Sequence, residues 1–289
     1  MSWFRWMSAA GLVVLAVLSV AQQATAQAYG LSHDRSTGTS QLVQVNASSG
    51  VITPIGPGLV GCCELGVGAS AIDVSGDAAY AVGPDASGAD LQLLKYSLSA
   101  GIGIEVGLLG TNDRVIGLEF ESSSQRLLGL LVTPARQIRM VHINTDTGIA
   151  NQIHTGVLDC CVLEPGLTAL SGGQFLFVAR LRAETSSTRS IYGFSTDGSG
   201  GLTTTALPLG TSLVAMAADA TSGLVYGLQQ TFSEPPRVAS LQLVQVGATG
   251  LSPIGSAISG CCAVAIDTAT VVGGALRVIA REPGAAGLS

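Results

Sequence analysis

Short apolar runs separated by small polar turns recur along almost the whole chain. Typical runs are VIGLEF (115–120), LVYGLQ (224–229) and LQLVQV (241–246), which are rich in Val, Ile and Leu and are bounded by Gly, Ser, Asp or Asn. Runs of this length and composition predict β-strands. Helical periodicity is nearly absent after the N-terminal segment, so the pattern predicts an all-β protein.

The runs belong to a repeat of about 50 residues. QLVQVNASSGVITPIG (41–56) recurs as QLVQVGATGLSPIG (242–255), and MVHINTDTGIANQIHTG (140–156) is a more distant copy. Two further relatives lie between these copies, at 93–111 and 191–211. Each unit contains four strand-like runs, and the turn between its third and fourth runs ends in glycine. A glycine there supplies the positive φ that such hairpin loops need.

Four-stranded units at this period predict the blades of a β-propeller. In that fold the blades repeat around a central axis, so only short strand edges are left unpaired. First strands are expected near residues 70, 115, 167, 213 and 264, which predicts five blades. Residues 41–56 would complete the blade that begins near 264 and close the ring. AYGLS (28–32) and ALRVIAR (275–281) then compete for one second-strand position. A six-bladed or incompletely closed ring is the alternative.

The blades also resemble a known group of proteins. TSLVAMAADATSGLVYGL (211–228) and LVQVNASSGVITPIG (42–56) are similar to blades of the broad YVTN/NHL-like propeller superfamily of secreted bacterial proteins. The resemblance extends from Tyr29 to about Arg281. It implies a propeller fold, but that superfamily hosts binding modules, scaffolds and several classes of enzyme, so it does not select a function.

The N-terminus predicts export. Arg5 precedes the uncharged run Ala9 to Ala21, and Ala24-Thr25-Ala26 has the small-x-small pattern of a signal-peptidase site. The run is too short to span a bilayer as a helix. We therefore expect a signal peptide at 1–26, a single propeller domain at 27–289, and a secreted or periplasmic location. An uncleaved membrane anchor is the alternative.

Composition narrows the expected partners. Without Arg5, the chain has 12 basic and 19 acidic residues, a net charge of −7, and Lys95 is its only lysine. Such a chain is a poor candidate for binding nucleic acid or an anionic membrane surface. We expect an unidentified protein, small-molecule or carbohydrate ligand, and a monomer.

All six cysteines occur as adjacent pairs. The pairs fall where the fourth strand of one unit leads to the first strand of the next, and they mark alternate units. In the intervening units, Gly110-Thr111 and Gly210-Thr211 occupy this position. In the propellers that the chain resembles, this connection lies on the face where ligands usually bind. The cysteines are Cys62, Cys63, Cys160, Cys161, Cys261 and Cys262.

Three interpretations of the pairs remain open, and a disulfide within each pair is favoured. Neighbouring Cα atoms lie about 3.8 Å apart, so such a ring is strained, and it stiffens one loop without closing a long one. Disulfides between loops, for example from Cys62 or Cys63 to the last pair, would close a large loop but leave the middle pair without a partner. A metal site is least favoured, because metal sites usually use spaced cysteines.

No strong catalytic motif is present. Ser32 in GLSHD lacks the glycine that closes a nucleophile elbow, and His33 beside Asp34 is expected to be a solvated turn. NTDTG (144–148) and STDGSG (195–200) resemble pieces of calcium loops, but their position in the repeat favours hairpin turns. Asp73 and its equivalent Asp267 are candidate hydrogen-bond acceptors in turns.

The sequence therefore favours a secreted, non-catalytic propeller, in which the Cys-Cys loops stiffen a ligand-facing rim and no cofactor or metal is needed. The alternative is an exported enzyme, either a hydrolase or a quinone- or metal-dependent oxidoreductase. That alternative would require His142, His154 and an acid such as Glu119 to converge in the central channel.

Overall fold

The computed structural model describes most of the chain from Gln27 to Arg281. The described ranges are 27–34, 37–46, 49, 51–60, 69–85, 87–111, 113–154, 157–158, 161–181, 189–208, 211–219, 222–232, 239–247, 250–259, 263–264, 269–272, 275–278 and 280–281. Within them the regular structure consists of strands alone. No helix in these ranges is long and apolar enough to cross a membrane.

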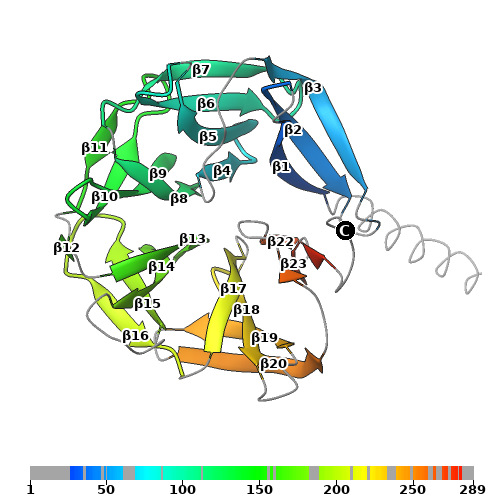
Figure 1. Ribbon diagram of the computed structural model, residues 1–289, viewed down its shortest axis with the longest axis vertical. Coiled ribbons are helices and arrows are strands. Elements are labelled where there is room, and N and C mark those ends of the chain that lie inside the picture. The colour runs from blue at the N-terminus through cyan, green and yellow to red at the C-terminus, as the bar shows by residue number, and fades with distance from the viewer. Residues whose placement is uncertain are drawn as a thin grey trace, which may run out of the picture.

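Five antiparallel sheets follow one another around a ring, as blades of a five-bladed β-propeller (Figure 1). Blade 1 contains β1 (Gln27–Asp34), β2 (Thr39–Asn46) and β3 (Ile52–Val60). Blade 2 contains β4 (Ser70–Asp73), β5 (Ala78–Pro84), β6 (Leu91–Ser97) and β7 (Gly103–Leu108). Blade 3 contains β8 (Arg114–Glu121), β9 (Arg126–Val132), β10 (Gln137–Ile143), β11 (Ala150–Gln152) and β12 (Val157–Leu158). Blade 4 contains β13 (Cys161–Ser171), β14 (Gln174–Leu181), β15 (Arg189–Ser195) and β16 (Thr203–Ala206). Blade 5 contains β17 (Thr211–Ala218), β18 (Val225–Phe232), β19 (Ala239–Gly247) and β20 (Gly250–Ser259).

The blades pack face to face, and this explains the composition of their strands. The middle strands β5 and β9 are buried over nearly their whole length because each has a neighbouring blade on both faces. Continuous apolar runs such as RLLGLLV suit a strand covered on both sides. The outer strands β7 and β20 lie at the circumference and are largely exposed. The predicted all-β propeller fold is therefore confirmed.

The core consists of layers between blades. One apolar cluster joins blades 1 and 2 around Leu42 and Tyr96, and another joins blades 2 and 3 around Tyr80 and Leu131. A third, rich in aromatic residues, joins blades 3 and 4, and a fourth joins blades 4 and 5. Among the described residues, none of these clusters joins blade 5 to blade 1.

Glycines bring adjacent blades into close backbone contact at three joints, an arrangement we call the glycine clasp. The turn between the third and fourth strands of one blade rests on the outer strand of the preceding blade. A Cβ on Gly101 of blade 2 would collide with the Ile55 carbonyl of blade 1. Gly148 meets Gly107 in the same way. A Cβ on Gly198 would make a looser contact, 3.0 Å from the carbonyl of Ile153, which directly follows the outer strand β11. At the fourth joint Gly250 has no such neighbour within 4 Å.

The first and last described segments lie at the joint between blades 5 and 1. AYGLS lies in β1, which pairs with β2, so it takes the second-strand position for which the two segments compete. The C-terminal residues form two small sheets, in which β22 (Thr270–Val272) pairs with β23 (Ala275–Arg277) and β21 (Ala263–Val264) pairs with β24 (Ala280–Arg281). β22 contacts both β17 and β1 (Figure 1).

Candidate functional site

The cysteine pairs fall at one class of connection, as the repeat predicts. The first pair lies between the end of β3 at Val60 and the innermost β4. The second pair lies at the start of β13, and the third lies between β20 and β21. Each pair therefore follows the last strand of one blade and precedes the next element of the chain. Cys161 begins β13, and its backbone pairs with Leu181. The predicted disulfides themselves lie outside the described residues.

Two ion pairs lie near the same end of the blades. Asp113 precedes β8, and its buried carboxylate pairs with the Arg139 guanidinium from β10. A buried carboxylate is stable only when it is paired, so this contact fixes the start of an innermost strand. In blade 4, Arg189 Nε lies 3.0 Å from Glu164 Oε1. Sequence reasoning did not identify either pair.

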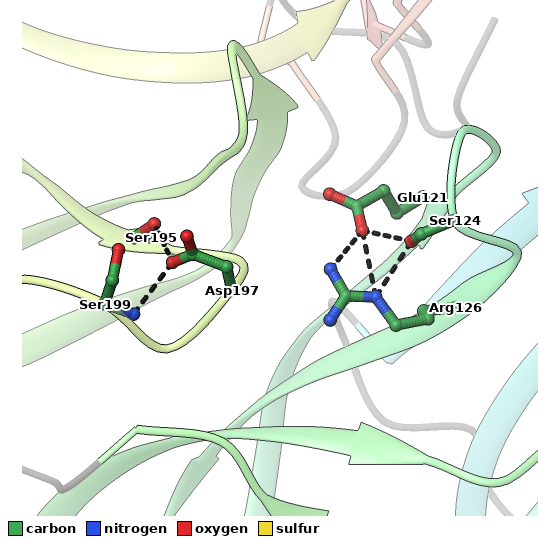
Figure 2. Close-up of polar contacts among 6 residues, drawn as sticks. All are labelled: Glu121, Ser124, Arg126, Ser195, Asp197 and Ser199. Carbon is green, nitrogen blue, oxygen red and sulfur yellow. Dashed lines mark hydrogen bonds and ion pairs between the residues drawn. The ribbon is translucent and has the colours of Figure 1, made fainter.

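At the opposite ends of the strands, the side chains of Asp197 and Asn144 accept hydrogen bonds from residues of their own turns. Figure 2 shows Asp197 accepting hydrogen bonds from the Ser195 hydroxyl at 2.6 Å and from the Ser199 amide at 2.8 Å. In NTDTG, Asn144 Oδ1 accepts from the amides of Asp146 and Thr147. These contacts are those of hairpin turns, as expected for both apparent calcium-loop fragments. Among the described residues there is no group of three His, Cys, Asp or Glu side chains that could hold a metal.

The other turns follow the same chemistry. The buried Asp73 accepts from the Ser75 hydroxyl and the Gly76 amide, as predicted for a turn acceptor, whereas Asp267 lies outside the described residues. Figure 2 also shows Glu121 bound by Ser124 and Arg126. Burial opposes ionisation of Glu121, but hydrogen bonds from Ser124, Arg126 and Thr196 of blade 4 lower its pKa.

The turn aspartates predict a loss of stability in acid. Hydrogen bonds from Ser195 and Ser199 lower the pKa of Asp197 from 3.8 to about 2. Because the folded pKa is depressed, the stabilisation is complete above the unfolded value and disappears as pH falls toward the folded value. We expect the melting temperature to fall between about pH 4 and pH 2, and to fall less steeply in Asp197→Asn. The melting temperatures of both proteins can be measured by circular dichroism across this pH range. If they fall equally with pH, Asp197 does not make this contribution.

The candidate catalytic residues occupy separate environments. His154 is buried, and its ring lies tilted by 39° against Phe194 with the ring centroids 4.7 Å apart. A hydrogen bond of 3.0 Å joins its Nε2 to the Gly200 carbonyl. His142 is half-buried on β10, and burial lowers its pKa. Glu119 lies on the innermost strand β8, where its Oε1 accepts a hydrogen bond of 2.8 Å from Thr168.

Two further observations concern blade 1. The side chain of His33 lies outside the described residues, and the exposed Asp34 accepts a hydrogen bond of 3.0 Å from Thr37. A surface hollow lies on β2 and β3, at the end of blade 1 away from Val60, where the first Cys-Cys connection begins. No titratable side chain lines it, so we do not assign it a reaction. Its lining residues are Gln44, Asn46, Ser49, Val51 and Thr53.

Comparisons with known proteins identify the fold. No family model matches the chain, and no curated protein matches its sequence. The crystal structure of TolB from Acinetobacter baumannii is similar with a TM-score of 0.51 at 12% identity, over 82% of this chain and 54% of that one. Exo-β-1,3-galactanase from Phanerochaete chrysosporium, crystallised with galactose, gives 0.50 at 7% identity, over 83% and 66%. The chain thus spans about half the length of TolB. At these identities the likeness shows the fold alone, and that fold is the β-propeller.

Proposed function

We propose that this protein is an exported, non-catalytic β-propeller that binds a protein, carbohydrate or small-molecule partner. The observation that carries the proposal is the placement of all three Cys-Cys pairs at one class of connection. Connections of the same class lie on the same face of a propeller, so a single partner could contact several of them. The secreted or periplasmic location, the signal peptide and the membership of the YVTN/NHL-like superfamily are parts of the proposal that rest on the sequence.

Within this proposal each pair forms a disulfide between its own two cysteines. Such a bridge encloses no intervening residues, so it contributes little chain entropy to stability. Its effect is to limit the conformations of the connection and to present a stiff apolar surface to a ligand. Preorganisation of that kind reduces the ordering cost of binding. Non-reducing peptide mapping should find each pair two hydrogens lighter and joined to no other peptide.

A ligand screen on matched variants tests the binding function. Sugars, peptides, quinones and divalent metals are added to the oxidised protein, and a bound ligand is expected to raise its melting temperature. Changing Cys62 and Cys63 together to serine should reduce the ligand-induced shift and leave the melting temperature without ligand unchanged. Thr111→Ser, in a connection without cysteine, is the control and should behave as the wild type.

Two results would contradict this function. A shift produced only by metals or quinones would favour the enzyme instead. A large fall in the ligand-free melting temperature of the serine variant would point to a bridge between loops, because only a bridge that closes a long loop adds several kcal/mol, about 5 for some 200 residues.

A further inference from the structure

One end of blades 3 and 4 carries an excess of positive charge. It is the end at which the second Cys-Cys pair lies, and the two blades are neighbours in the ring (Figure 1). The described charged residues there are Arg114, Arg136, Arg139, Arg180 and Arg189, with Asp113 and Glu164. The undescribed residues of the same connections add Arg182, Asp159 and Glu184, so six arginines stand against four acids. Since the whole chain has a net charge of −6, this end is a positive area on an acidic protein.

Three of these arginines have no acidic partner among the described residues. Each of the two described acids is already in an ion pair with another arginine. Arg114, Arg136 and Arg180 are exposed and form no ion pair with a described residue, and we call these three the arginine surface. Arg180 also lies directly opposite Arg189 in the ladder between β14 and β15. Like charges in that position repel, so the arginine surface does not stabilise the fold.

The strand register places the blade 3 part of this surface at one hairpin. Arg114 on β8 lies opposite Val132, the last residue of β9. Arg136 lies in the loop that joins β9 to β10, where its amide donates to the Thr133 carbonyl at 2.8 Å. All residues from 113 to 154 are described, so the course of this blade from β8 to β11 is complete.

Arg136 has a backbone conformation that favours glycine. Its φ is 64°, and the corresponding loop of blade 2 has Gly88 there, with a φ of 72° and a similar amide hydrogen bond to the third residue before it. Two other described residues besides glycine have positive φ, Asp77 and Gln125, and each forms a side-chain hydrogen bond within its own blade. Arg136 forms none with a described residue. Strain without such compensation indicates that the side chain acts on something outside the chain.

We propose that the arginine surface binds the carboxylates of an acidic polysaccharide. A guanidinium group binds a carboxylate through two parallel N–H donors, and a chain of uronic acids presents one carboxylate on each sugar. Protein interfaces are centred on buried apolar or aromatic side chains. The large exposed hydrophobic side chains among the described residues all lie outside this end of blades 3 and 4, which favours a sugar chain over an acidic protein. This inference rests on the proposed binding function and specifies its ligand.

Calorimetric titration with polygalacturonate at low ionic strength tests the proposal. The wild type should bind it but not its methyl ester, in which the carboxylates are uncharged. Arg136→Gln removes the charge and keeps the strained backbone, whereas Arg136→Gly removes both, and each should bind at least about tenfold more weakly. Gln125→Gly is the matched control, because Gln125 has a φ of 55° at the opposite end of the same blade. It should bind as the wild type does.

Melting temperatures complete the test. Arg136→Gly should melt at the wild-type temperature or above it, because glycine adopts positive φ without strain. A lower melting temperature in both Arg136 variants would show that this side chain stabilises the fold, and would overturn the proposal. So would wild-type binding by those variants, equal binding of the methyl ester, or tighter binding of polyglutamate, which would indicate an acidic protein.

Failure of this proposal can be distinguished from failure of the proposed function. A wild type that does not bind polygalacturonate would overturn the ligand assignment. If another ligand then still raises the melting temperature, and the serine variant of Cys62 and Cys63 reduces that shift, the binding function stands. If no ligand produces such a shift, both proposals fail.

Discussion

Gly101→Ala is expected to lower the free energy of unfolding by about 3 kcal/mol or more. Gly101 has a φ of 64°, and its missing side chain leaves room for the Ile55 carbonyl of the preceding blade. A methyl group there would strain its own backbone and force the two blades apart at the same time. Because the obstructing atoms belong to backbone, no side-chain rotation can relieve the collision. Urea unfolding followed by far-UV circular dichroism measures the loss.

Gly88→Ala separates the free-energy cost of backbone strain from the cost of the collision between blades. Its φ is 72°, but the added Cβ has no atom within 4 Å, so it should lose only the backbone cost of about 1 kcal/mol. The excess loss in Gly101→Ala is then the contribution of the glycine clasp. If both variants lose the same free energy of unfolding, the turn of blade 2 is not in close contact with blade 1 in solution.

Local patterns in the sequence were sufficient to predict the blades. Four of the expected first strands are β4, β8, β13 and β17. They were predictable because the apolar runs and turn residues that define a strand are adjacent in sequence. The fifth, near residue 264, lies in the two-residue β21, which pairs with β24.

The closing of the ring depends on contacts that local patterns do not encode. AYGLS and ALRVIAR have similar strand patterns, so propensity does not choose between them. β1 reaches β2 across a short connection, whereas a strand near residue 277 would have to close a loop of more than 200 residues. The entropy of loop closure favours the nearer strand. The length of the connection was visible in the sequence and could have decided the competition.

In the candidate site too, features set within one repeat were predicted, and features set by contacts between strands or blades were missed. The connection class of the cysteine pairs and the turns around Asn144 and Asp197 were predicted, because each is set by its position within one repeat. The pair between Asp113 and Arg139 was missed, since its partners are far apart in sequence and strand patterns do not show which charged side chains meet across a blade. The glycine clasp was also missed. Positive φ at a turn glycine is a local property, but contact with a neighbouring blade is a property of the assembled ring.

Phe177→Ala is expected to cost about 3–5 kcal/mol, the usual range for removing a buried aromatic side chain. Phe177 is 1% exposed in the cluster between blades 3 and 4. Its ring stacks on Tyr192 and Phe194, with centroids 5.5 and 5.7 Å away. Phe177→Leu retains most of the volume and should lose about 1.5 kcal/mol or less. Urea unfolding of both variants measures these losses.

The shape of the Phe177→Ala transition tests how the blades depend on one another. The apolar clusters lie between blades, so removing one ring weakens two blades at once and should lower the urea midpoint of the whole protein. The slope of the transition should stay constant, because the same surface is exposed on unfolding. A transition that divides into two steps would show instead that blades on either side of the cavity unfold independently, as in repeat proteins whose interfaces are weak. The inter-blade layers would then be separate cores, and the glycine clasps, which connect backbone to backbone, would be insufficient to couple them.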